Sequence, residues 1–317
     1  MEYRNFGTAG LKVSRICLGT AFRAAPDEAT CRTTLERALD LGVNFLDCAN
    51  AYRGGRSECI LGDALQGRRD QYVITTKVQS PMGSGPNDRG LSRIHILREV
   101  ERSLTRLRTD YIDVYLLHAP DAGTPIEETL CALEDLVRQG KVRYTGCCNY
   151  DAWQVCQALR VCDRCRLTPY IAVQNHYNLL DRSIERELLP FCRDAGLGVM
   201  TYSPLAVGLL SGLVRHGQPP PPGSPWAEGR PGFRELLTPA ADAVVAELIR
   251  IGADRGKTPA QVAIAWILSH AEISAAMIGP DTPDQVVENL GGVGWELAPE
   301  ERAALDAISA PCQGWPK

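Results

Sequence analysis

Four polar residues of complementary chemistry stand at or just after the ends of apolar stretches in this 317-residue chain. Asp47 closes one such stretch and Tyr52 follows five residues later, while Lys77 and His118 close the next two. Tyrosine is a weak acid with a pKa of ~10 when unperturbed. An ammonium group beside it stabilises the phenolate and lowers that pKa. The set therefore predicts a proton donor, Tyr52, with charged partners around it.

The roles of the other three residues follow from their charges and hydrogen-bonding groups. Asp47 would pair with Lys77, hold it in place and offset its charge. His118 would hydrogen-bond a substrate oxygen or tune the tyrosine. This combination suits general acid catalysis of carbonyl reduction, or the reverse reaction. Since no side chain supplies a hydride, the chemistry requires a hydride-carrying cofactor.

The elements that must bring these residues together alternate between two kinds of segment. Apolar or β-branched runs predict eight strands, at 15–19, 43–47, 72–77, 111–118, 142–147, 171–174, 198–203 and 275–279. Helical periodicity lies between them, at 28–41, 56–66, 93–108, 126–139, 151–161, 183–195, 240–269 and 283–290, with a helix–helix turn at 252–258. Mostly continuous apolar strands favour a parallel sheet covered by helices. We therefore predict an α/β fold, a (β/α)8 TIM barrel that forms one domain over residues 1–317.

Three other segments bear on the architecture. A doubly wound sheet is the alternative to a barrel, but the turn after the first run, "LGTAFRAAP", lacks the glycine pattern that such a sheet normally carries. The stretches "EYRNFG" and "LKVS", joined by "TAG", predict an N-terminal β-hairpin that caps the barrel bottom. The Pro- and Gly-rich loop 215–233 is interpreted as a flap over the site, or else as a disordered insertion.

Composition narrows the class of partner. The formal charge of −4 and the absence of a basic stripe give no reason to expect nucleic acid. No window approaches the ~18 apolar residues of a membrane span. The N-terminal stretch lacks an apolar signal core, so we expect a cytoplasmic protein. The twelve cysteines are expected to be free thiols, mostly buried, and no cluster has convincing metal-ligand spacing.

Seven motifs in a fixed order carry a family resemblance. They are "GVNFLDCANAY", "YVITTK", "SLTRLRTDYIDVYLLH", "LVRQGKVRYTGCCN", "VQNHYNLLDR", "YSPLAVGLLSG" and "TPDQVVENL". Together they resemble the aldo-keto reductase family over nearly the whole chain. The resemblance implies a (β/α)8 barrel that binds a nicotinamide dinucleotide across its rim. It also carries the family's catalytic residues onto Asp47, Tyr52, Lys77 and His118.

The same resemblance implies a set of cofactor contacts. Cys148–Asn149 replaces the family's Ser-Asn pair, so the hydroxyl contact to the carboxamide is weakened or lost. Tyr202 matches the aromatic residue that stacks on the nicotinamide ring. The other contacts implied on the nicotinamide and pyrophosphate side are Thr20, Asp47, Gln174, Ser203, Pro204, Leu205, Gly208 and Leu210. Those implied at the adenosine end are Gly279, Asp281, Gln285, Glu288 and Asn289.

One of these residues departs from the family pattern. Members that use NADP usually place Lys, Arg or Ser in the segment that reads "GPDTPDQ" here. Asp281 instead puts a carboxylate near the expected 2′-phosphate, where it would repel that group or accept a hydrogen bond from a free ribose hydroxyl. NADP(H) is favoured from the family, and NAD(H) is the alternative.

The expected partner is a small molecule with a carbonyl or alcohol group. Phe22, Arg53 and Trp226 are candidates for its pocket. The predicted reaction interconverts an aldehyde or ketone, sugar-like carbonyls included, and its alcohol. The alternative function is a redox-sensing, NADP(H)-binding regulatory subunit with little turnover, similar to the channel β-subunits that share this fold. The sequence leaves the oligomeric state open.

Overall fold

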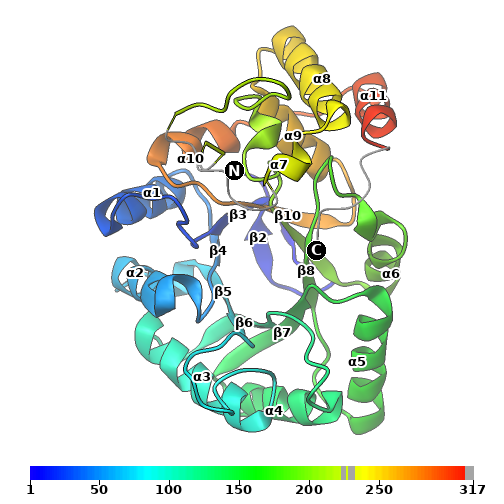
Figure 1. Cartoon of the computed structure of the whole chain (residues 1–317). Coiled ribbons are helices and arrows are strands. Elements are labelled where there is room, and N and C mark those ends of the chain that lie inside the picture. The colour runs from blue at the N-terminus through cyan, green and yellow to red at the C-terminus, as the bar shows by residue number, and fades with distance from the viewer. Residues whose placement is uncertain (223–225, 228–232, 311–317) are drawn as a thin grey trace.

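A closed barrel of eight parallel strands forms the centre of the computed structural model (Figure 1), which describes residues 1–222, 226–227 and 233–310. Its strands are β3 (Ile16–Gly19), β4 (Phe45–Asp47), β5 (Val73–Val78), β6 (Ile112–Leu117), β7 (Val142–Cys148), β8 (Ala172–His176), β9 (Gly198–Tyr202) and β10 (Ile273–Ile278). Neighbours in sequence are neighbours in the barrel, and β10 closes it against β3. The predicted (β/α)8 barrel is confirmed.

Helices surround the barrel and cover its outer face (Figure 1). They are α1 (Glu28–Asp40), α2 (Arg56–Ala64), α3 (Arg93–Leu107), α4 (Ile126–Arg138), α5 (Ala152–Cys165), α6 (Leu188–Ala195), α7 (Phe233–Leu236), α8 (Pro239–Arg255), α9 (Pro259–Leu268), α10 (Pro283–Leu290) and α11 (Pro299–Ser309). Short 3-10 turns are η1 (Tyr52–Gly55), η2 (Arg69–Gln71), η3 (Ser183–Glu185) and η4 (Leu209–Ser211). None of the helices in the described part of the chain is both long and apolar enough to cross a membrane.

Two helical segments differ from the sequence prediction, and one agrees in detail. The predicted turn at 252–258 separates α8 from α9, because Gly256 ends α8 with a positive φ and Thr258 caps the start of α9. The segment 183–195 is not one helix, since η3 precedes α6. Helix α11 was not predicted. It is fixed by Asp306, whose carboxylate accepts a hydrogen bond of 2.8 Å from the indole of the buried Trp266.

The N-terminal hairpin consists of β1 (Tyr3–Asn5) and β2 (Lys12–Ser14), which pair antiparallel. Directly after β1, the ring of Phe6 is fully buried and meets the ring of Phe45 edge-on at 5.2 Å. A Cβ at Gly198 would lie 2.4 Å from the Phe6 ring, so only glycine fits there. Both Phe45 and Gly198 begin strands of the barrel. The hairpin therefore caps the bottom of the barrel, as predicted.

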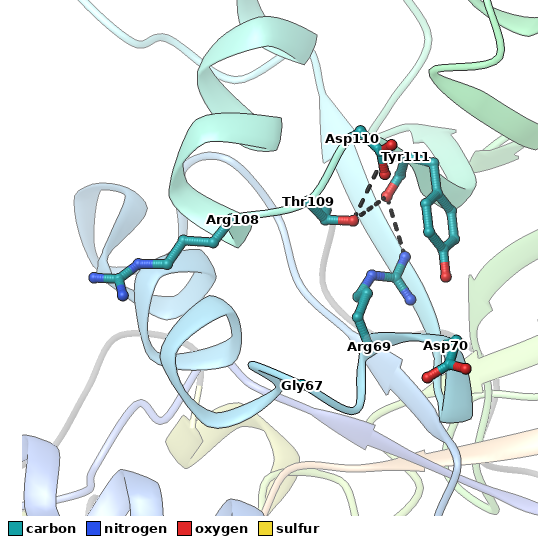
Figure 2. A pocket seen from close by; sticks show the side chains of 7 residues that line it. All are labelled: Gly67, Arg69, Asp70, Arg108, Thr109, Asp110 and Tyr111. Carbon is teal, nitrogen blue, oxygen red and sulfur yellow. Dashed lines mark hydrogen bonds between the residues drawn. The ribbon is translucent and has the colours of Figure 1, made fainter.

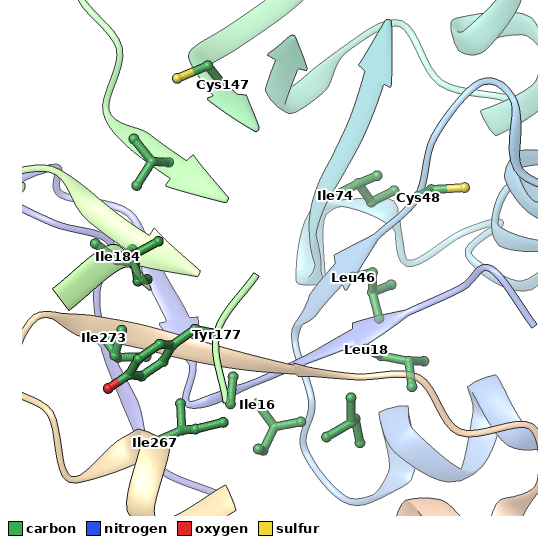
Figure 3. Packing of buried hydrophobic residues seen from close by; sticks show 14 of the residues in the cluster. Ile16, Leu18, Leu46, Cys48, Ile74, Cys147, Tyr177, Ile184, Ile267 and Ile273 are labelled. Atoms are coloured by element: carbon green, nitrogen blue, oxygen red, sulfur yellow. The ribbon is translucent and has the colours of Figure 1, made fainter. Parts of the chain in front are cut away.

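An apolar layer lies between the strands and the helices (Figure 3). On β3, Ile16 and Leu18 face this layer, whereas Cys17 between them faces the barrel interior. This alternation follows from the two-residue period of a strand. The cysteines in the described residues are free, but not all are buried, because Cys131 and Cys156 lie on exposed positions of α4 and α5. The barrel thus has two apolar layers, one between strands and helices and one inside the barrel. The polar side chains described below lie at the carboxyl ends of the strands.

The predicted flap loop is only partly within the described residues. Its described portions are 215–222, 226–227 and Phe233, and the rest lies outside them. Trp226 is buried, its indole N–H donates to the carbonyl of Val207 at 2.9 Å, and its ring lies 4.7 Å from that of Phe233. Trp226 therefore attaches this part of the loop to the segment that follows β9.

Candidate active site

The four predicted catalytic residues lie together at the carboxyl ends of three adjacent strands. Asp47 is the last residue of β4, Lys77 lies near the end of β5, and His118 follows β6 directly. Tyr52 begins η1, the turn that connects β4 to α2. Carboxyl ends of parallel barrel strands meet at one rim, where the sites of such barrels are built. The sequence predicted this grouping.

Lys77 and Asp47 form a fully buried ion pair. The Lys77 Nζ donates to Asp47 Oδ2 at 2.6 Å, and both side chains are 0% exposed. Nζ also donates to the carbonyl of Cys48 at 2.7 Å. The other carboxylate oxygen, Oδ1, accepts from Thr75 Oγ1 at 2.5 Å and Gln174 Nε2 at 2.8 Å. Because both charges are paired and hydrogen-bonded, the pair is stable in the barrel interior.

The hydroxyl of Tyr52 adjoins this pair. The Lys77 ammonium donates to Tyr52 Oη at 3.3 Å and lies 4.8 Å from the centre of the Tyr52 ring. The His118 ring meets the Tyr52 ring edge-on, with the centroids 5.8 Å apart. The phenol therefore has a cation on one side and an imidazole on the other.

Burial and charge act in opposite directions on Tyr52. Burial raises the pKa of the phenol, and the Lys77 ammonium lowers it by less, so the net pKa lies above its ordinary value. The expectation of a lowered pKa is wrong in this state, because it counted the charge and not the desolvation. Burial is the largest single influence on the pKa of Lys77 and acts to lower it, but Asp47, Tyr52 and Cys148 together outweigh it, so that pKa lies above its ordinary value. Lys77 is therefore cationic and Tyr52 neutral at pH 7.

His118 is neutral at the same pH. Burial and the charge of Lys77 lower the pKa of His118 to about 4, and Arg23 adds to that shift. Its Nδ1 lies 3.5 Å from the hydroxyl of Ser80. A neutral imidazole has one N–H donor and one acceptor nitrogen. His118 can therefore give one hydrogen bond to an oxygen atom without bringing a second charge to the site.

A buried acid, which the sequence did not single out, holds the segment that carries Tyr52. The Glu99 side chain on α3 is fully buried, accepts from Asn50 Nδ2 at 3.2 Å and pairs with Arg102 at 2.7 Å. The backbone N–H of Asn50 donates to the carbonyl of Lys77 at 3.3 Å. The sequence contained one signal for this role: Glu99 lies on the apolar face of the segment 93–108, and a carboxylate is rarely buried unless it is paired.

The predicted nicotinamide contacts form a second chain of hydrogen bonds at the rim. Tyr202 Oη donates to Asn149 Oδ1 at 2.8 Å, and Asn149 Nδ2 donates to the carbonyl of His118 at 2.9 Å. Cys148 is buried in the barrel interior, and burial raises the pKa of its thiol. The His176 ring packs edge-on against that of Tyr202 at 5.2 Å. These residues lie beside the four catalytic candidates.

The remaining predicted cofactor residues occupy three loops on the same rim. The buried Thr20 hydroxyl donates to the carbonyl of Asp47 at 2.9 Å. The segment after β9 has left-handed backbone at several of its residues, with Pro204 and Leu210 buried; its predicted contacts are Ser203, Pro204, Leu205, Gly208 and Leu210. Around the start of α10, Gly279, Gln285 and Glu288 are exposed, whereas Asn289 is buried.

Asp281 has a partner that the sequence did not reveal. Its Oδ1 accepts from the backbone N–H of Ala24 at 2.9 Å, and its own N–H donates to Gln285 Oε1 at 2.8 Å. The carboxylate thus connects the loop after β10 to the loop after β3. Asp281 is half-buried, and no hydrogen bond to its second carboxylate oxygen is found among the described residues.

A pocket of about 370 Å³ opens beside Tyr52. Two of the predicted substrate residues, Phe22 and Arg53, line it, and the Arg53 Nη1 donates to the carbonyl of Phe22 at 3.0 Å. The third, Trp226, is not among the lining residues. Within the described residues no group of three or more His, Cys, Asp or Glu side chains could hold a metal ion.

A second pocket, of about 570 Å³, lies at the opposite end of the barrel (Figure 2). It is formed by the loops that precede β5 and β6, around Arg69 and Tyr111. The Arg69 guanidinium is already bound to Asp113 at 2.6 Å and to the carbonyls of Tyr72 and Tyr111. This pocket contains none of the predicted site residues.

The fold and the rim residues define a (β/α)8 barrel with a polar site at the carboxyl ends of its strands. The sequence model of the aldo/keto reductase family matches residues 15–310. The chain therefore belongs to the aldo/keto reductase family.

Similar proteins carry two kinds of name. The uncharacterized oxidoreductase YrpG of Bacillus subtilis is 38% identical, and the match covers 97% of this chain and 96% of YrpG. A probable voltage-gated potassium channel subunit beta of Oryza sativa subsp. japonica is 36% identical over 100% of this chain and 98% of its own. A protein of the same description from Arabidopsis thaliana is 37% identical over 100% of this chain and 98% of its own.

Proposed function

We propose that this protein is a nicotinamide-dependent oxidoreductase that interconverts an aldehyde or ketone and its alcohol, with Tyr52 as the general acid and base. One observation supports this most directly. The Tyr52 hydroxyl lies 3.3 Å from the ammonium of Lys77, beside an open pocket. Membership of the aldo/keto reductase family and the similarity to an oxidoreductase agree with this proposal.

In the direction of reduction, Tyr52 transfers its proton to the carbonyl oxygen. The raised pKa keeps the phenol protonated at neutral pH, as a donor must be. Lys77 then stabilises the phenolate that forms, because its charge is held at 3.3 Å from the oxygen. Asp47 keeps the ammonium in place, and neutral His118 donates a hydrogen bond to the substrate oxygen. In the oxidation direction the same proton returns to Tyr52.

The residues around the rim fit a nicotinamide dinucleotide. Gly279 leaves open space where a Cβ would stand, and α10 begins nearby with a capped N-terminus, which favours an anion. The segment 203–208 exposes left-handed backbone that can follow an extended ligand. Tyr202, Asn149 and Gln174 would hold the nicotinamide end. When bound in reduced form, the cofactor supplies the hydride that adds to the carbonyl carbon. We propose NADP(H), with NAD(H) as the alternative because of Asp281.

The test is a comparison of Tyr52→Phe with the wild type. NADPH or NADH is mixed with a panel of carbonyl compounds, and the absorbance of the reduced nicotinamide is followed. We expect kcat to fall by about 10²–10⁴-fold, since the proton donor is lost while the ring remains. Cofactor affinity should stay nearly constant. Tyr111→Phe, at the opposite end of the barrel, is the matched control. Full kcat in Tyr52→Phe would rule out the tyrosine assignment.

A second candidate function is a redox-sensing regulatory subunit that binds NADP(H) with little turnover. It is favoured by the names of the rice and Arabidopsis relatives, which are described as probable potassium channel β-subunits. The same assay separates the two functions. Tight cofactor binding without turnover across a broad carbonyl panel would favour the regulatory function over the enzyme.

A further inference from the structure

We propose that the carbonyl substrate carries an oxyanionic group, a carboxylate or a phosphate, which Arg23 and Arg53 bind beside Tyr52. This inference rests on the proposed carbonyl chemistry at Tyr52 and adds the class of substrate. Three observations support it: the residues that line the pocket, the absence of an ion pair between either arginine and a described residue, and the way Arg53 is held.

The pocket beside Tyr52 is formed by two short segments. Ala21, Phe22 and Arg23 come from the loop after β3, and Ala51, Tyr52 and Arg53 come from the loop after β4. Each segment contributes one arginine to the same pocket of about 370 Å³. A ligand in this pocket would therefore contact the residue that carries the proposed proton donor and two arginines.

Among the described residues, no carboxylate forms an ion pair with either guanidinium group. Neither Arg23 nor Arg53 forms an ion pair with any residue that the structure describes, although both side chains are exposed on the rim. The charge of Lys77 deeper in the site is already neutralised by Asp47. The pocket therefore presents two guanidinium groups that form no ion pair with a described residue, and a cleft lined by charges of one sign attracts an anion.

The acids near the pocket are engaged elsewhere. Glu28 pairs with Arg56 through two hydrogen bonds of 2.8 and 2.7 Å. Asp27 caps α1 by accepting the N–H of Thr30 at 2.7 Å. Asp281 accepts the N–H of Ala24. These carboxylates therefore make their hydrogen bonds outside the pocket; Arg56 is the main cause that lowers the pKa of Glu28, and the charge of Arg53 adds a smaller part.

Arg53 is held in an unusual backbone conformation. Its φ is 51°, in the left-handed region that non-glycine residues rarely adopt, and Gly54 and Gly55 continue with φ of 63° and 93°. Its Nη1 is fixed to the carbonyl of Phe22, which itself has a φ of 44°. Strained residues of this kind persist where the surroundings impose them, and they cluster at ligand sites. One edge of the guanidinium is thus anchored, and its other N–H groups remain for a ligand.

Arg23 acts on the residues of the proposed reaction. Its charge contributes to lowering the pKa of His118 and opposes the rise in the pKa of Tyr202. The next residue, Ala24, is bound to Asp281, which holds this part of the loop over the rim. Arg23 is therefore close enough to the rim residues for its charge to act on them.

The pyrophosphate of the cofactor is the other oxyanion that two arginines could bind. The start of α10 and the left-handed segment after β9 already suit that anion. The two arginines instead line the pocket beside Tyr52, where Arg23 directly follows Phe22 in the chain and Arg53 directly follows Tyr52. This placement favours the substrate, and the experiment must separate the two ligands.

The experiment uses pairs of aldehydes that differ mainly in charge. One pair is 4-formylbenzoate and its neutral methyl ester, and the other is 4-formylphenyl phosphate and 4-methoxybenzaldehyde. We expect the wild type to prefer the anionic member in kcat/KM by about tenfold to hundredfold, mainly through KM, as for hydrogen bonds to charged groups. The pair with the larger preference distinguishes a carboxylate from a phosphate ligand.

The double variant Arg23→Gln/Arg53→Gln should bring that preference close to one. Arg138→Gln/Arg164→Gln is the matched control, because it removes two exposed guanidinium groups on α4 and α5, outside the pocket, and it should keep the wild-type preference. Calorimetric titration of terephthalate supplies a readout that does not need turnover, and binding should weaken in the double variant alone.

Three results would overturn the inference. The wild type could treat both members of each pair alike, or the double variant could keep the preference. The double variant could also weaken nucleotide binding and leave the preference unchanged, which would assign the arginines to the cofactor. If no aldehyde is turned over but terephthalate binds through the arginines, the proposed reaction fails and the oxyanion site stands.

Discussion

The buried ion pair between Lys77 and Asp47 should behave as one energetic unit. Removal of one partner leaves the other charge in the barrel interior, which costs about 3–5 kcal/mol in such pairs. Asp47→Asn leaves the ammonium with the Cys48 carbonyl at 2.7 Å as its main acceptor. Lys77→Met leaves the carboxylate with its bonds from Thr75 and Gln174. We therefore expect Asp47→Asn to be the more destabilising of the two single changes.

The double variant Asp47→Asn/Lys77→Met removes both charges at once. Its cost should resemble that of one single change, so the coupling energy would be about 3 kcal/mol. The assay is the free energy of unfolding from urea titrations followed by circular dichroism. Activity does not discriminate here, because all three variants disturb the proposed proton donor.

An ion pair of the same length provides the control. Arg32 and Asp63 also approach to 2.6 Å, but their side chains are 38% and 26% exposed. Solvent screening should limit the coupling in a cycle of Arg32→Gln and Asp63→Asn to less than about 1 kcal/mol. The reasoning fails if the two cycles give similar coupling energies, or if either single change at Lys77 or Asp47 leaves stability unaltered.

Three further predictions concern other parts of the molecule. The pKa of His118 is about 4 in the folded protein against an ordinary 6.5, so the unfolded chain takes up the proton at a higher pH than the folded protein does. Between pH 6.5 and 4 the free energy of unfolding of the wild type should therefore fall by up to about 3 kcal/mol, a loss that His118→Asn does not show. Parallel pH profiles of unfolding for the two proteins would contradict this. Phe6→Ala should cost about 3–5 kcal/mol in the free energy of unfolding and leave kcat unchanged at 25 °C, where a lower kcat would argue against a purely structural cap. Asp281→Asn keeps an acceptor for the N–H of Ala24 and removes the negative charge. The NADPH/NADH ratio of kcat/KM should therefore rise about tenfold. An unchanged ratio would mean that the carboxylate points away from the ribose.

The barrel and the grouping of its rim residues could be predicted because they depend on local patterns. Apolar runs mark the strands, and a residue that ends such a run in a parallel barrel must lie on one rim. Lys77 and His118 end runs that are mostly apolar or β-branched, so their positions followed from the pattern alone. The cap at Thr258 and the break at Gly256 were equally local.

Contacts between distant loops could not be predicted in the same way. The bond from Ala24 to Asp281 joins residues 257 positions apart, and nothing in either segment specifies it. The direction of the pKa of Tyr52 also depends on tertiary burial, which a residue list does not contain. The burial of Glu99 could have been predicted, because an acid on an apolar helical face needs a buried hydrogen-bond partner. The identity of that partner, Asn50, could not, because it lies 49 positions away in the sequence.

The N-terminal hairpin has a consequence for how the chain is made. Phe6 leaves the ribosome well before Gly198, yet the cap it forms includes Gly198 on β9, and Thr8 bonds to Gly196 across 188 positions. Contacts at such separation form only after the intervening chain is available, and the entropy of closing that loop opposes them. The base of the barrel therefore stays open during synthesis until β9 has emerged. In a nascent chain halted before that strand, the ring of Phe6 would lack Gly198 as a packing partner, so the cap would be incomplete.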